Sequence, residues 1–158
     1  MIMLEVAALS VQADPQALYD AAVADRLGGR PAAAVPKLQQ VLAARADDVD
    51  ARLNLGLALL ALNRTDEAAE AFRDVIAQAP DYTDAYIGLA RVEQRRGNLA
   101  TARLNVAAAL RRAPGNPEAL ALTIDASAAR YRTGVVTGLH PGLRVGSADG
   151  HFQVSARW

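Results

Sequence analysis

Apolar and polar positions alternate with helical spacing through the middle of the chain. In the stretch DEAAEAFRDVIAQAP, residues 66–80, apolar side chains recur three or four positions apart, and Pro80 ends the pattern. A similar stretch, TARLNVAAALRRAP, ends at Pro114, which lies 34 residues further on (114 − 80). The pattern therefore predicts helices that recur with a fixed period.

Three rows of sequence agree when the chain is aligned at this offset. Small and apolar residues share columns: Ala34, Ala68 and Ala102; Leu38, Phe72 and Val106; Leu42, Ile76 and Leu110; Ala22, Gly56 and Ala90. Another column holds only glycine or asparagine, the residues that best tolerate a left-handed backbone: Gly29, Asn63 and Gly97. Each row is therefore predicted to contain two helices, the first of which ends at a left-handed cap.

A helical hairpin of this size cannot bury its own apolar faces, so the copies are expected to stack. The predicted fold class is all-α, an α-solenoid with a short β-prone tail. Its hairpins span residues 15–48, 49–82 and 83–116, and a capping helix spans 117–130. The alternative, an irregular helical bundle, does not account for the common register of the rows.

The middle row resembles the tetratricopeptide repeat. The residues that match that family's pattern are Leu55, Gly56, Ala68, Phe72 and Pro80. Arg52 and Leu59 depart from it, because the pattern has an aromatic residue and a tyrosine there. The other rows match at fewer positions, among them Leu18, Gly29 and Leu38 in the first and Tyr86, Gly97 and Val106 in the third. The resemblance implies a right-handed solenoid whose first helices line a concave, peptide-binding side.

The first helix of the middle unit carries apolar residues on two faces, and this observation defines the predicted groove. Leu53, Leu57 and Leu60 form a stripe in addition to the one needed for stacking. The predicted groove has an apolar floor and a basic end, and it comprises Tyr19, Val23, Leu53, Asn54, Leu57, Leu60, Ile87, Arg91 and Arg95. The alternative is that the chain's own N-terminal segment or tail covers the leucines, with both arginines on a solvated face.

Some tetratricopeptide domains hold an acidic C-terminal peptide with a clamp of Lys, Arg and Asn side chains from successive first helices. Asn54 occupies a matching column in this chain. The other columns do not match, because they hold Tyr19 and Val23 in the first unit and Asp84 and Gly88 in the third. The resemblance therefore does not extend to a chaperone-tail clamp.

Charge and composition argue against several other functions. The 17 basic residues balance 17 acidic ones, so no net field attracts nucleic acid, and the absence of cysteine excludes disulfides and thiolate chemistry. Ser147, Asp149 and His151 lie too close in sequence for a catalytic triad, and His140 and His151 lack the spacing of a metal pair. We expect no enzyme activity, no cofactor and no metal site.

The two ends of the chain differ from the repeats. Residues 1–14 are interpreted as an N-terminal helix or the remnant of a signal peptide. Residues 131–158 are rich in glycine and β-formers, and Asp149-Gly150 predicts a hairpin that pairs Ala148 with His151, Val145 with Val154 and Leu143 with Ala156. The alternation after Gly150 also resembles a strand of an outer-membrane β-barrel, so the tail is a possible route to self-association or a membrane link.

Two functions remain open at this point. The first is a non-catalytic scaffold that binds a protein or peptide partner in its groove. The alternative is the periplasmic part of an outer-membrane secretion or envelope component. Periplasmic or envelope-associated localisation is favoured over cytoplasmic, and only the alternative function requires export.

Overall fold

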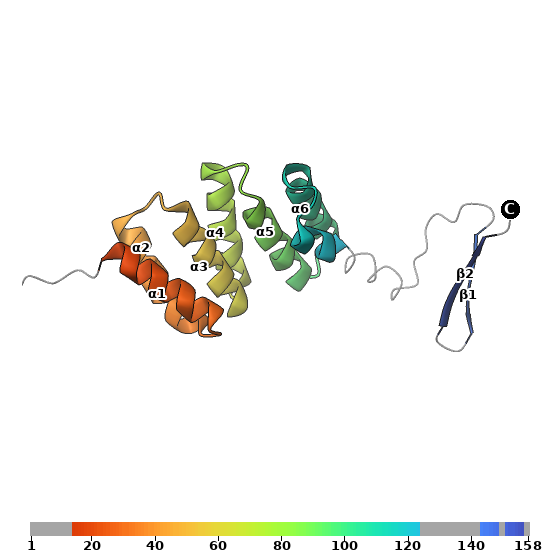
Figure 1. Ribbon diagram of the computed structural model, residues 1–158, viewed down its shortest axis with the longest axis horizontal. Helices are drawn as coiled ribbons and strands as arrows, with labels where there is room; N and C mark the ends of the chain where they lie inside the picture. Colours follow the sequence, from red (N-terminus) through yellow and green to blue (C-terminus); the bar gives the residue numbers. More distant parts are fainter. Residues whose placement is uncertain (1–13, 124–142, 149–150, 157–158) are drawn as a thin grey trace, which may run out of the picture.

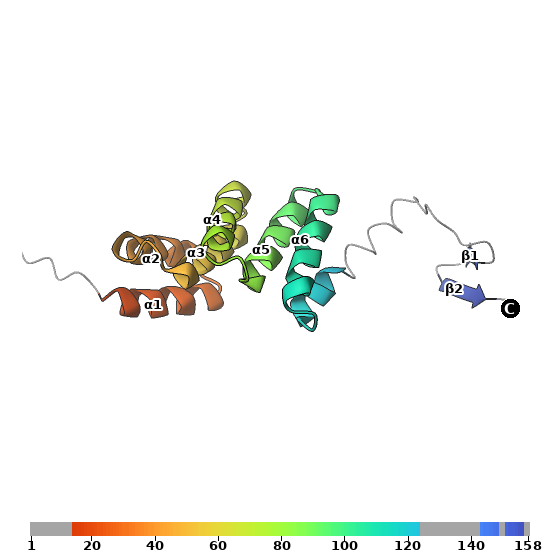
Figure 2. The ribbon, with the colours of Figure 1, turned by 90° about the horizontal axis from the view of Figure 1, so that it is seen from above.

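Three consecutive helical hairpins form the main part of the computed structural model, which describes residues 14–123, 143–148 and 151–156. Their helices are α1 (Pro15–Leu27), α2 (Pro31–Ala44), α3 (Val49–Ala61), α4 (Thr65–Gln78), α5 (Thr83–Arg95) and α6 (Leu99–Arg112). A further helix is described over residues 117–123. The hairpins follow one another along the long axis of the molecule (Figures 1 and 2). Together they form the all-α solenoid that the repeated rows predict.

The loops within the hairpins share one left-handed residue at the same position. The φ angles are 73° at Gly29, 60° at Asn63 and 79° at Gly97. After each of them, the next backbone amide donates back to the helix: Arg30 to the Asp25 carbonyl, Arg64 to that of Leu59 and Asn98 to that of Glu93, at 2.8–2.9 Å. This bond is characteristic of a Schellman C-cap. The predicted left-handed column is confirmed.

The first helices begin at side-chain caps that also recur with the period. Asp14 accepts from the Gln16 amide at 3.1 Å, and Asp48 accepts from the Ala51 amide at 2.8 Å. Asn116 accepts from the amides of residues 118 and 119, each at 3.0 Å. Tyr82 occupies the remaining position of this column and makes no side-chain cap bond. Asp and Asn are preferred at this position because their side chains accept from the unpaired amides of the first turn.

Phe72 is the largest fully buried side chain, and it fills the space between two hairpins. A Cβ atom added at Gly56 in α3 would lie 2.7 Å from the nearest atom of the ring, and one added at Gly88 in α5 would lie 2.5 Å from it. The ring therefore packs directly against the backbone of α3 and α5. Glycine at both positions is what allows this approach.

A second apolar cluster lies at the C-terminal end of the hairpins. Ala119 and Leu122, from the helix over residues 117–123, pack with Ile87 and Ala90 of α5 and with α6. This helix covers the apolar surface of the third hairpin, which is the role predicted for a capping helix. Its predicted continuation to residue 130 lies outside the described residues.

Two antiparallel strands, β1 (Leu143–Ala148) and β2 (His151–Ala156), form the described part of the tail (Figure 1). Their register pairs Leu143 with Ala156, Val145 with Val154 and Ala148 with His151. The structure thus has the pairing that the sequence predicts. The proposed turn at Asp149-Gly150 lies outside the described residues, as do residues 1–13.

Two buried carboxylates fasten the loops of the first and third hairpins. Asp25 accepts from Arg30 Nη2 at 2.7 Å and also from Lys37 of α2. Glu93, which is 34 residues further on than Leu59 as Leu59 is than Asp25, accepts from Asn98 Nδ2 at 2.8 Å and from Arg96 Nη1 at 2.8 Å. The bonds from Lys37 and then Arg30 lower the pKa of Asp25, and the bond from Asn98 lowers that of Glu93. Folding therefore favours the charged form of both groups.

Acid is expected to weaken the fold through these two carboxylates. Because their pKa values are lowered on folding, their stabilisation is complete above the ordinary values of 3.8 for Asp25 and 4.5 for Glu93 and is lost as the pH falls through the lowered values. Chemical denaturation between about pH 7 and pH 2 should show a shallower acid loss for the Asp25→Asn, Glu93→Gln double variant than for wild type. The exposed Glu70→Gln is the control, and an equally steep loss in the double variant would contradict this role.

Candidate peptide-binding face

A polar network joins the first helices of the first two hairpins. Asn54 of α3 donates from Nδ2 to the Tyr19 hydroxyl at 3.1 Å and to the Asp50 carbonyl at 2.9 Å. Its Oδ1 accepts from Arg26 Nε of α1 at 2.9 Å. Asn54 is only 8% exposed, so these bonds compensate for the burial of its amide. Asn54, predicted as a groove residue, thus joins α1 to α3.

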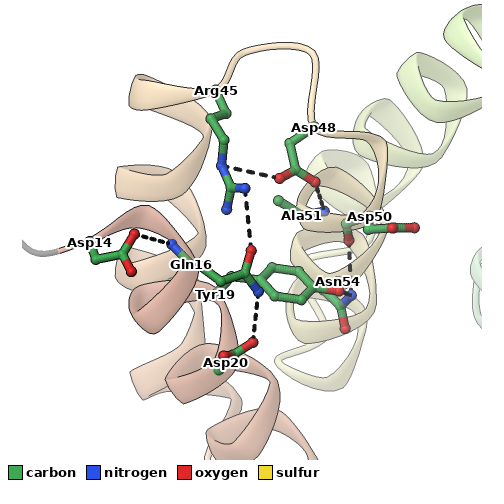
Figure 3. Close-up of polar contacts among 9 residues, drawn as sticks. All are labelled: Asp14, Gln16, Tyr19, Asp20, Arg45, Asp48, Asp50, Ala51 and Asn54. Carbon is green, nitrogen blue, oxygen red and sulfur yellow. Dashed lines mark hydrogen bonds and ion pairs between the residues drawn. The ribbon is translucent and has the colours of Figure 1, made fainter.

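Tyr19 lies among several carboxylates on this side of the molecule. Figure 3 shows its ring beside Asn54, with Asp20 on one side and Asp48 and Arg45 on the other. Arg45 Nε is 3.4 Å from Asp48 Oδ2, and its Nη1 donates to Gln16 Oε1 at 3.4 Å. Partial burial raises the pKa of the Tyr19 hydroxyl, and the negative charges of Asp50 and Asp48 raise it further. Tyr19 therefore remains a neutral hydrogen-bonding group well above physiological pH.

Tyr82 extends this surface to the third hairpin. Its hydroxyl, located just before α5, donates to Asp50 Oδ1 at the start of α3. Burial raises the pKa of the Tyr82 hydroxyl strongly, and the hydrogen bond to Asp50 contributes in the same direction. Phenols from the first and third hairpins thus meet at α3 on one continuous polar surface.

The predicted apolar floor is largely internal. Leu53, Leu60 and Ile87 are 6%, 4% and 2% exposed, and all three belong to the apolar clusters between helices. Part of the surplus leucine stripe is therefore covered by neighbouring residues. Tyr19, Val23 and Leu57 are only partly buried, so they are the predicted apolar groove residues that retain accessible surface.

The predicted basic end is engaged in internal contacts. Arg91 forms an ion pair with Glu118, in the helix over residues 117–123. Arg95 donates from Nη1 to the carbonyl of Leu60, in the last turn of α3, where a positive charge also suits the helix dipole. The two arginines connect α5 to its neighbours, which the sequence did not predict.

Sequence reasoning missed several accessible residues of this face. Leu27 is 71% exposed and follows Tyr19 and Val23 at intervals of four, so the three form one stripe on α1. Its spacing was a usable signal. Asp20, Asp50 and Asp84 are also exposed, but nothing in the periodicity of the apolar residues distinguishes them from ordinary solvent-facing carboxylates.

The described residues offer no arrangement suited to other chemistry. No three His, Cys, Asp or Glu side chains within them come together as metal ligands would. None of the described helices has the combined length and hydrophobicity that a bilayer span requires. The predicted Ser147, Asp149 and His151 contacts and the position of His140 lie outside what the structure describes.

Comparison with known proteins agrees with this architecture. Residues 19–83 match one model described as the tetratricopeptide repeat, and residues 59–123 match a second with the same description. These matches together extend over about two thirds of the chain, which therefore belongs to the tetratricopeptide repeat family. None of the curated protein sequences matches it.

Solved structures with the same fold come from several organisms. The tetratricopeptide domain of Arabidopsis OM64 is 14% identical with a TM-score of 0.70, covering 75% of this chain and 98% of that domain. The second such domain of human RPAP3, in complex with the HSP70 peptide SGPTIEEVD, is 19% identical with a TM-score of 0.65, covering 72% and 98%. The type III secretion translocator chaperone SycD of Yersinia enterocolitica is 18% identical with a TM-score of 0.68, covering 76% and 86%. At these identities the likeness shows the fold.

Proposed function

We propose that this protein is a non-catalytic scaffold that binds a peptide segment of a partner protein across the first helices α1, α3 and α5. The observation that supports this most directly is the accessible stripe of Tyr19, Val23 and Leu27 on α1, which adjoins the half-buried Leu57 of α3. Exposed apolar side chains gathered on one face are typical of a protein-interaction site. The human RPAP3 relative, whose structure contains a bound peptide, lends this proposal the support of fold-level analogy.

The groove that supports this function is narrower than the sequence suggested. Leu53, Leu60 and Ile87 would shape it from within the core, while Tyr19, Val23 and Leu57 would contact the partner. Asn54 would act by holding α1 against α3. Arg91 and Arg95 would act by fixing α5. The alternative function, a periplasmic part of an outer-membrane component, has no support from a described contact and stays a prediction.

Leu27→Glu is expected to weaken peptide binding about tenfold or more, because a buried leucine contributes about 1.5–3 kcal/mol and each 1.4 kcal/mol is about a tenfold change in affinity. The measurement is fluorescence anisotropy with peptides that wild type selects from a synthetic panel. Leu27 is 71% exposed, so the substitution should leave the fold intact.

Leu104→Glu is the matched control for this experiment. Leu104 is 70% exposed and lies on α6, a second helix, so its substitution introduces the same charge at the same degree of exposure away from the proposed face. Its affinity should equal that of wild type. Equal losses in the two variants, or wild-type binding by both, would rule out the α1 stripe as the contact surface.

A further inference from the structure

One exposed carboxylate from each first helix contributes to the proposed face. We call Asp20 of α1, Asp50 of α3 and Asp84 of α5 the acidic row. Asp50 and Asp84 lie at equivalent positions of successive hairpins, 34 residues apart in sequence. The row therefore runs across the hairpins, in the direction in which they stack.

Two phenols connect the members of this row. The Tyr82 hydroxyl donates to Asp50, while Tyr19, next to Asp20 in sequence, is held by Asn54 one turn along α3 from Asp50. The raised pKa of Tyr19 reflects burial first, then Asp50, with a smaller contribution from Asp20. Burial and then Asp50 raise the pKa of Tyr82, and Asp84 adds to the effect. These mutual effects place phenols and carboxylates on one continuous surface.

The cations near this surface are directed to other partners. Arg26 donates to Asn54, Arg91 pairs with Glu118, and Arg95 donates to the Leu60 carbonyl. Arg45 pairs with Asp48, outside the row. Within the described part of the chain, the acidic row itself takes part in no ion pair: Asp20 accepts from the neutral Gln16 amide at 2.9 Å, and Asp50 accepts from a neutral phenol. The face thus carries uncompensated negative charge.

The spacing of the row suits an elongated ligand. Packed helices lie about 8–10 Å apart, and an extended chain advances about 3.3 Å per residue, so carboxylates on successive first helices correspond to about every third residue of a bound strand. The described carboxylates do not gather closely enough to hold a metal ion. A single compact cation would therefore engage only one member of the row.

We propose that the peptide taken by this face is basic and extended, with a lysine or arginine at about every third position. This inference rests on the proposed function and specifies its partner. The cationic side chains meet Asp20, Asp50 and Asp84, while apolar side chains between them contact Tyr19, Val23 and Leu57. An acidic segment such as SGPTIEEVD, which the human RPAP3 domain binds, would instead bring its carboxylates against the row.

The direct test compares three labelled twelve-residue peptides by fluorescence anisotropy. The first repeats Lys-Leu-Ser, the second repeats Glu-Leu-Ser, and the third has the composition of the first with its lysines grouped at one end. The first should bind at least about tenfold more tightly than the second at low salt, and its affinity should fall as salt is added, because screening weakens exposed charge pairs. It should also bind more tightly than the third.

Asp84→Asn should reduce affinity for the Lys-Leu-Ser peptide about two- to fivefold, the range expected for one exposed charge pair. Asp50→Asn combined with it should reduce the affinity further. Glu70→Gln removes the same charge from the solvent face of α4 and should leave binding unchanged. Equal effects of Asp84→Asn and Glu70→Gln would overturn the assignment of the acidic row.

The remaining outcomes separate this inference from the proposed function. Tighter binding of the Glu-Leu-Ser peptide that Leu27→Glu abolishes would overturn the basic-peptide inference and leave the peptide-binding face in place. Binding of neither peptide would also overturn the inference. The proposed function would fail with it only if no peptide of the synthetic panel showed affinity that depends on Leu27.

Discussion

Phe72→Ala is expected to lower the free energy of unfolding by about 3–5 kcal/mol, the usual range for removing a buried aromatic side chain. The ring is fully buried, and its neighbours in α3 and α5 include Gly56 and Gly88, which have no side chains that could move into the vacated space. The resulting cavity therefore persists, and the loss should lie in the upper part of this range. Chemical denaturation followed by circular dichroism measures it.

Leu104→Ala is the control for this substitution, because a side chain that is 70% exposed contributes little to the core. Its effect should stay within about 0.5 kcal/mol. A loss below about 1 kcal/mol for Phe72→Ala would mean that the ring does not organise the junction between the second and third hairpins.

Gly88→Leu is expected to destabilise the protein by about 1–3 kcal/mol, the cost typical of overpacking a core. Even a single Cβ at this position would lie 2.5–2.7 Å from three atoms of the Phe72 ring, and the ring is enclosed and cannot withdraw easily. The same denaturation experiment applies. Gly115→Ala serves as the control, since a Cβ at that position meets nothing within 4 Å.

A double-mutant cycle distinguishes this contact from a general effect on helix α5. In the Phe72→Ala background, the leucine introduced at position 88 has space to occupy, so the cost of Gly88→Leu should shrink markedly or change sign. Additive losses in the double variant would show that position 88 is sensitive for a reason other than the ring.

The sequence alone determined the features that depend on local backbone chemistry. Gly29, Asn63 and Gly97 could be recognised as left-handed caps because only such residues adopt that conformation at little cost. The helix starts at Asp14 and Asp48 were equally local, although the analysis of the columns did not use them. The strand register was predictable because a two-residue turn fixes every pair that follows it.

Tertiary structure alone decided which of the repeated positions are available to a partner. Leu53 and Leu57 are similar in sequence, yet the first lies in the core and the second is partly accessible. Likewise, Arg95 could be recognised as a cation near a helix end, but its contact with the Leu60 carbonyl joins residues 35 positions apart. The periodicity of one helix specifies the direction of a side chain, whereas its exposure and its partners depend on how closely the neighbouring helices approach.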